Sequence, residues 1–294
     1  ASDVYKRQHQ QIGDFDWLFR GEGGTDVGVM RNILRYNVYQ YYLLESQPTQ
    51  DLDNWRVHYK AVGDANMVIN RTEKTQFSED FKNQIIAEAS FIRAYVYFQL
   101  TLMWGDVPLW TDEVTSENLE KISLLPRSPQ KDVYDQIIKD LLFASEILPD
   151  EREASEQGRI TKWAAKSLLA KVYLFNEQWE EASKIAQEVI ASPYHQLSSD
   201  YAAIFDTNSG WNKECIFVIP FMSDVKGQWL HTVAAPDLTY ESIDYDYSKG
   251  GLIRPDGKIA KSNGDLIQGW GVYYLTTEFA CLLYTSDAAD EARS

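Results

Sequence analysis

The sequence predicts a mainly α-helical protein with a tetratricopeptide-like scaffold, an α-α superhelix that carries irregular loops and a few short strands. The first observation is the stretch 158–190, where apolar and small residues recur at helical spacing in two runs separated by Asn176–Gln178. The second is a series of further helical periods between residues 33 and 148. The third is a change after Ser192 to a glycine-rich, loop-like composition.

Three helices are expected first. Ile33–Leu44 is tyrosine-rich and has a helical period. The next two helices present apolar faces formed by Trp55, Tyr59, Val62, Asn66 and Ile69, and by Ala87, Phe91, Ala94, Tyr95, Phe98 and Leu102. Gly105 followed by Pro108 should end the third helix, because glycine suits the left-handed turn at a helix C-terminus and proline cannot continue a helix.

A fourth helix is expected to begin at Ser128, as the N-cap, with Pro129 in its first turn. Its apolar face runs through Val133, Ile137, Leu141, Ala144 and Leu148, and Pro149 ends it.

The helical hairpin follows. Its first helix carries Ala165, Leu168, Leu169, Val172 and Tyr173, and its second carries Trp179, Ala182, Ile185, Ala186, Val189 and Ile190. Ala170 and Ala182 are small enough to let the two helices approach closely. Because such a repeat is a scaffold, function is expected in the segments mounted on it.

Beyond the hairpin, Ile216–Phe221 is expected to form a short strand. The segment 222–275 is rich in glycine and has little helical period. A loop of this length is usually functional or contains small strands of its own.

Composition limits the partners of the chain. Its 294 residues, 44% hydrophobic and 13% aromatic, suffice for a packed core. A net charge of -16 argues against nucleic acid and against an anionic lipid surface. No apolar run is long enough to span a membrane. Cys215 is expected to be a small core residue, and the four histidines show no metal-ligand spacing.

The two ends are expected not to belong to the natural protein. Residues 1–8 and 281–294 resemble the two reading directions of one sequencing adapter, which leaves 9–280 as an internal piece of a longer protein. That piece is interpreted as one domain, with a helical scaffold over about 33–192 and a loop-rich ligand-side segment over about 193–280.

Several blocks, in order, resemble the SusD-like (RagB/SusD) family. The most recognisable runs from Glu88 through Arg93 to Leu100 and continues into Trp104-Gly-Asp-Val-Pro-Leu109. Pro126-Arg-Ser128 and Gly158-Arg-Ile-Thr-Lys162 resemble the next two blocks. Together with weaker matches, the resemblance spans roughly residues 20–280.

The resemblance implies a surface glycan-binding lipoprotein of Bacteroidetes nutrient uptake. Such a protein is not an enzyme, needs no cofactor, and sits at the outer membrane as a lid on a TonB-dependent transporter of the SusC type. Family members are typically held there by a lipid anchor at an N-terminal cysteine, which we expect to lie outside this piece of the protein.

Sugar binding needs flat aromatic faces together with planar hydrogen-bonding groups. The family places its ligand contacts in two regions that are rich in such residues here. The candidate ligand residues are Trp229, His231, Tyr240, Tyr245, Tyr247, Tyr39 and Tyr41, with Arg31 and Asn37 as partners for hydroxyl groups. Packing inside the protein is the alternative for each aromatic residue, above all for Tyr36, Tyr39 and Tyr42.

Other polar residues are interpreted as structural. Arg93 is expected to be buried and paired with Glu88 or Asp106, and Asn66 to be a hydrogen-bonded core amide. The stretch 244–250 alternates oxygen ligands like a calcium loop, but position 255 is a proline where a glutamate ligand is needed, so no metal is expected.

Two other functions remain open. A helical glycoside hydrolase would need paired carboxylates across a cleft, for which Asp237, Glu241 and Asp244 are candidates. A tetratricopeptide adaptor would grip a peptide in a smooth concave groove.

Overall fold

The computed structural model describes residues 28–30, 49–201, 204, 212–218, 245–246, 251–252 and 273–275. The chain divides into two compact units, one formed by residues 1–54 and 222–294 and the other by residues 55–221. The expected helix at Ile33–Leu44 and both expected adapter ends lie outside the described residues.

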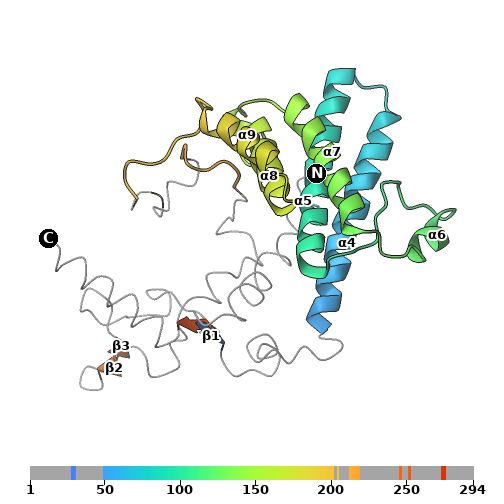
Figure 1. The fold of residues 1–294 in the computed structure, drawn as a ribbon, viewed down its shortest axis with the longest axis horizontal. Helices are drawn as coiled ribbons and strands as arrows, with labels where there is room; N and C mark the ends of the chain where they lie inside the picture. Colours follow the sequence, from blue (N-terminus) through green and yellow to red (C-terminus); the bar gives the residue numbers. More distant parts are fainter. Residues whose placement is uncertain are drawn as a thin grey trace. The chain divides into compact units, whose positions relative to one another are not determined.

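The described helices follow the expected order (Figure 1). They are α4 (Thr49–Glu73), α5 (Glu79–Trp104), α6 (Leu119–Ser123), α7 (Gln130–Ile147), α8 (Lys162–Phe175) and α9 (Trp179–Ile190), with a 3-10 turn at Ala154–Glu156. Helix α5 packs on α7, α7 on α8, and α8 on α9. Each of these four helices thus packs on a near neighbour in sequence, as a hairpin scaffold requires. Among the described residues, no helix is long and apolar enough to cross a membrane.

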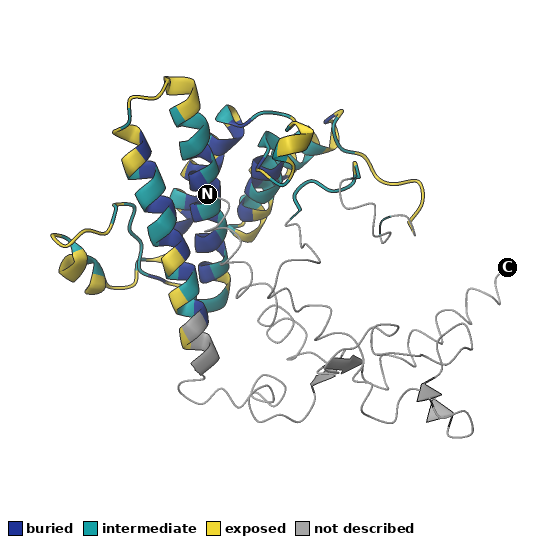
Figure 2. Cartoon of the chain, turned by 180° about the vertical axis from the view of Figure 1, so that it is seen from behind, coloured by how far each residue is buried: buried dark blue, intermediate teal, exposed yellow. Residues whose placement is uncertain are grey.

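The core of the unit formed by residues 55–221 lies between these helices, as the buried positions in Figure 2 show. Its largest fully buried side chains are Tyr97, Phe98, Leu100, Ile137, Leu141, Leu148, Leu169, His58, Val62, Val107 and Val133. Nearly all residues expected on the inner faces of α5 and α7 are buried or half-buried. Leu102 is an exception and is 42% exposed. Phe98, one turn before Leu102, contacts Phe175, which is the last residue of α8. Leu102 therefore lies beyond the end of α8, which leaves its side chain uncovered.

The segment after α5 and the segment before α7 pair through one isolated β-bridge, between Val107 and Ser128. Gly105 ends α5 with φ of 69°, as expected, and its backbone N–H donates to Thr101 O at 3.0 Å. The expected Ser128 cap of α7 is wrong, because Ser128 N donates to Val107 O in a β-bridge and Pro129 takes the N-cap position. The side chain of Asp106 supplies the missing acceptor, since its Oδ1 accepts from Gln130 N at 2.8 Å.

The hairpin α8–α9 forms where expected. Thr161 caps α8 by accepting from Ala164 N, and Ala182 is buried in α9. Trp179 and Ile190, both expected on the packed face, are 59% and 80% exposed. They occupy the first and last positions of α9, which packs mainly against α8, so neither end is covered.

The expected strand at Ile216–Phe221 is wrong in its described part, where residues 216–218 form a bend. Two backbone N–H groups, of Glu214 and Cys215, donate to the side chain of Asn212 and fix a turn. The bend places Phe217 edge-on against Phe91 in the core, at 5.4 Å between ring centroids. Cys215 is half-buried and therefore does not lie in the core as expected.

We expect Leu169→Ala to lower the free energy of unfolding by about 2 to 5 kcal/mol, because it empties a fully buried site in α8. Leu174→Ala is the matched control, since Leu174 lies on the same helix and is 50% exposed. Urea unfolding of both variants measures the difference, and equal losses would show that the packed face of α8 is wrongly assigned.

Candidate functional site

Most of the candidate ligand residues belong to parts of the chain outside those that the structure describes. These residues are Trp229, His231, Tyr240, Tyr247, Tyr39, Tyr41, Arg31 and Asn37. The acidic candidates of the hydrolase alternative also lie outside the described residues; they are Asp237, Glu241 and Asp244. The backbone of Tyr245 lies in strand β2 (Tyr245–Asp246), opposite Leu252 in β3 (Gly251–Leu252). Small strands therefore occur inside the loop-rich segment, as expected.

A second β-ladder joins the two regions that supply the candidate ligand residues. Strand β1 (Gly28–Met30) immediately precedes Arg31, and strand β4 (Tyr273–Leu275) lies near the end of the loop-rich segment. The strands are antiparallel, with Met30 opposite Tyr273 and Val29 opposite Tyr274. Backbone pairing thus brings together two regions that are far apart in sequence.

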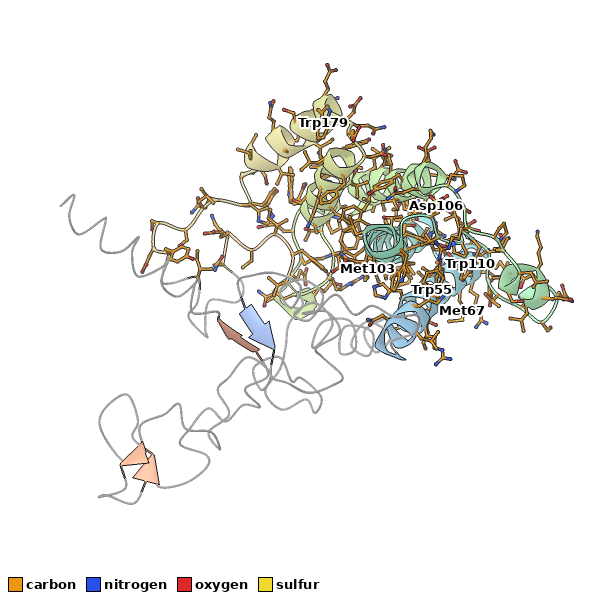
Figure 3. All side chains as sticks on the ribbon, turned by 60° about the horizontal axis from the view of Figure 1, so that its bottom comes forward. Trp55, Met67, Met103, Asp106, Trp110 and Trp179 are labelled. Carbon is orange, nitrogen blue, oxygen red and sulfur yellow. The ribbon has the colours of Figure 1, made fainter. Side chains whose placement is uncertain are left out.

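In the other unit, four half-buried aromatic rings form a continuous row along α4, the end of α5 and the segment after it. Trp55 contacts Trp104 edge-on at 5.2 Å and Tyr59 at 4.7 Å, and Tyr59 stacks on Trp110 at 4.9 Å. Figure 3 shows Trp55 and Trp110 near one another, with Trp179 away from them. All four rings also pack against the hydrophobic core, and the stacking of Tyr59 on Trp110 holds the segment that follows α5 against α4.

A buried polar network lies beside this row. Arg93 donates to both carboxylate oxygens of Asp140, at 2.7 Å each, and to Asn66 Oδ1 at 2.8 Å. Asn66 in turn donates to Trp110 O at 3.0 Å. Arg93, Asp140 and Asn66 are 6%, 4% and 0% exposed. The expected burial of Arg93 and Asn66 is confirmed.

The expected partner of Arg93 is wrong. Its counterion is Asp140, one carboxylate on the facing helix α7, and neither Glu88 nor Asp106. Burial raises the pKa of the Asp140 carboxyl, while the hydrogen bonds and charge of Arg93 oppose that rise. The signal available in the sequence was an acidic residue within the otherwise apolar face of α7, one place before Leu141.

Glu88 serves a different cluster. Its carboxylate accepts from Arg152 and Arg159, at 2.6 Å each, and Arg159 also pairs with Glu156. Arg152 additionally donates to Ile160 O. The cluster ties α5 to the segment that leads into α8. Within the part of the chain that the structure describes, no group of three His, Cys, Asp or Glu residues could hold a metal ion.

Comparison with known proteins assigns the family. A family model described as SusD-like, starch-binding and associating with the outer membrane, matches residues 24–174. The chain belongs to the SusD-like family. The expected helical, tetratricopeptide-like fold is confirmed by solved structures of SusD-like proteins.

Individual SusD-like relatives are distant and longer. SusD-like protein P25 of Formosa agariphila is 29% identical over 65% of this chain and 36% of its own length. A SusD-like protein of Bacteroides ovatus is 33% identical over 60% of this chain and 33% of its own. The chain thus spans about a third of the length of these curated relatives.

Two solved structures have folds similar to that of this chain. A SusD-like protein from Bacteroides fragilis is 29% identical, with a TM-score of 0.69 over 79% of this chain and 46% of its own. A laminarin-binding SusD-like protein is 20% identical, with a TM-score of 0.79 over 100% of this chain and 66% of its own.

We expect Asp140→Ala to destabilise the SusD-like fold by about 3 to 5 kcal/mol, because it leaves the buried Arg93 guanidinium without a counterion. Asp135→Ala is the control, since Asp135 pairs with Lys131 on the exposed side of the same helix and its loss should not be measurable. Chemical denaturation gives both values. Equal effects would contradict a structural role for the buried pair.

Stability should also fall as the pH rises above about 10. Burial raises the pKa of Tyr59 and of Tyr97, so both phenols keep their protons in the folded protein at a pH where unfolded tyrosines lose them. The folded state then binds more protons than the unfolded state, and increasing pH favours unfolding. Denaturation across this range in wild type and Tyr59→Phe tests this, since the variant should show a shallower decline. Identical slopes would refute it.

Proposed function

We propose that this protein binds a neutral or weakly charged oligosaccharide at the cell surface, does not cleave it, and passes it to a TonB-dependent outer-membrane transporter of the SusC type. The observation that carries the proposal is the match of residues 24–174 to a family described as starch-binding and associating with the outer membrane. In the longer natural protein, a lipid anchor would hold the domain at the membrane.

Relatives support an oligosaccharide as the ligand. One structural neighbour is described as laminarin-binding, and another, with a TM-score of 0.64, was solved with a xylogluco-oligosaccharide. The ladder between β1 and β4 gives physical support, because it joins the two regions that hold the candidate ligand aromatics. A helical scaffold combined with aromatic-rich segments suits a carrier, since stacking and hydrogen bonding hold a sugar reversibly.

The proposal is tested by glycan-array screening followed by calorimetry. If Trp229 or Tyr245 is a stacking face, its replacement by alanine should weaken binding by about 1 kcal/mol or more. Trp179→Ala is the matched control, because Trp179 is an exposed ring on α9 and should leave the affinity unchanged.

A reducing-end assay on the same glycan separates binding from hydrolysis. Release of product by the wild type would favour the hydrolase that the acidic residues leave open. Binding that survives both substitutions would move the site to the segment around Tyr39 and Tyr41. No binding to any glycan on the array would count against the carrier.

A further inference from the structure

The turn between α4 and α5 carries two exposed phenylalanine rings that contact each other. Phe77 and Phe81 are 54% and 49% exposed, and their ring centroids lie 5.2 Å apart in an edge-to-face arrangement. Figure 2 shows that this turn forms an exposed end of the two helices. Neither Phe77 nor Phe81 belongs to the hydrophobic core of the described residues, so the pair is aromatic surface that folding leaves in contact with solvent.

The backbone on both sides of Phe77 is fixed. Thr75 N and Thr75 Oγ1 both donate to Thr72 O, at 3.0 and 2.7 Å, and Thr72 is buried near the end of α4. On the other side, Lys82 N donates to Ser78 O at 3.0 Å where α5 begins. Because the turn is already ordered, a ligand that packs on the rings has little backbone ordering to overcome.

A local role at the start of α5 does not explain the pair. In a hydrophobic staple, the residue before the N-cap packs against the fourth residue of the helix. With Ser78 as the N-cap, these two positions are Phe77 and Lys82, so Phe81 is not the partner that a staple needs. The contact between the rings also leaves about half of each one exposed.

The apolar surface of the turn consists of aromatic rings alone. Residues 74–84 include Phe77 and Phe81 but no aliphatic residue. A segment that inserts into lipid needs a broad apolar face, and this turn offers only two rings. Rings set among polar side chains are instead what a sugar requires, because one face of the sugar packs on a ring while its hydroxyl groups need hydrogen bonds.

Polar groups suited to hydroxyls flank the rings. Gln76 directly precedes Phe77 and is exposed, and Gln84 lies one helical turn after Phe81. The side chain of Ser78 makes no capping hydrogen bond, so its hydroxyl is not committed to the helix. Two cations and two anions balance the charge of residues 74–84, which suits a neutral ligand; they are Lys74, Lys82, Glu79 and Asp80.

We propose that Phe77 and Phe81 form a second sugar-binding site, which packs on a neutral sugar unit of a polysaccharide. The inference rests on the proposed function and adds a contact in the unit formed by residues 55–221, whereas the candidate ligand residues belong to the unit formed by residues 1–54 and 222–294. Two contacts on one polymer raise the overall affinity, because the second forms at a high effective concentration once the first is made. A short oligosaccharide gains nothing from the second site, which therefore favours long glycans.

The first test measures the glycan affinity of full-length variants by calorimetry. The probes are starch, laminarin and xyloglucan, each as the polymer and as a short oligosaccharide of the same linkage. The double variant Phe77→Leu/Phe81→Leu removes the rings but keeps apolar side chains, and it should weaken binding of the polymer by about fivefold or more. Its affinity for the oligosaccharide should equal that of wild type.

Two further variants are controls for the ring itself and for its position. Phe77→Tyr/Phe81→Tyr keeps both rings and should bind the polymer as wild type does. Phe175→Leu removes a ring that is 50% exposed and packs edge-on against Phe98, and it should leave the polymer affinity unchanged. Equal losses in the leucine and tyrosine double variants would show that the rings do not act as stacking faces.

The second test observes the site directly. A fluorinated phenylalanine replaces Phe77, Phe81 or, as the control, Phe175 in the full-length protein, and fluorine NMR follows addition of the same polymer. The signals at positions 77 and 81 should shift, and the signal at 175 should not. Vesicles of phosphatidylethanolamine and phosphatidylglycerol are titrated in parallel, and a shift with vesicles but not with polymer would overturn the proposal in favour of lipid.

The outcomes separate the two proposals. Equal polymer affinity of wild type and the leucine double variant overturns the second site and leaves the carrier function standing. An equal loss of affinity for polymer and oligosaccharide would place the rings in the main ligand site and overturn a separate one. Failure of the wild type to bind any of the three glycans overturns the second site and counts against the carrier as well. Thermal unfolding of the leucine double variant should match wild type; if it does not, the tyrosine variant and the NMR signals, which keep both rings, decide.

Discussion

The buried ion pair between Arg93 and Asp140 is the interaction on which the described scaffold depends. The guanidinium of Arg93 on α5 binds Asp140 on α7 through two hydrogen bonds and Asn66 on α4 through a third. One side chain thereby fixes three helices to each other. Because an unpaired charge in this core would be costly, the helices can pack only in the arrangement that satisfies all three bonds.

The same network reaches the surface. Asn66 donates a hydrogen bond to the backbone carbonyl of Trp110 and so fixes the position of that residue. Stacking of Tyr59 on the Trp110 ring holds it further. The chain that leaves α5 is therefore held by polar and aromatic contacts before it continues to α6. A second cluster, in which Glu88 of α5 pairs with Arg152 and Arg159, holds the segment that leads into α8. In both places, charged or polar side chains of α4 or α5 orient a long connection between helices. The packed helices thus fix where each connection begins, while surface loops of this kind tolerate changes in sequence.

This division suits a SusD-like protein. The helices give a stable frame, and the candidate ligand residues belong to segments outside it. The pairing of β1 with β4 links the two segments through backbone hydrogen bonds, which do not depend on side-chain identity.

The sequence by itself determined the helices and their order, because the 3.6-residue period of α5, α7 and α8 and the glycine at position 105 are local signals. It also determined the family, since motifs such as Trp104-Gly-Asp-Val-Pro-Leu109 lie within one continuous stretch. Only the tertiary structure decided that Asp140 pairs with Arg93 and that Asp106 caps α7, because both partners come from a different helix or turn. It likewise decided that Trp179 and Leu102 are exposed, since periodicity gives the apolar face of a helix but not where its neighbour ends. The candidate ligand residues rest on family resemblance and aromatic content, because no local pattern in a sequence specifies which distant segments meet at a binding site.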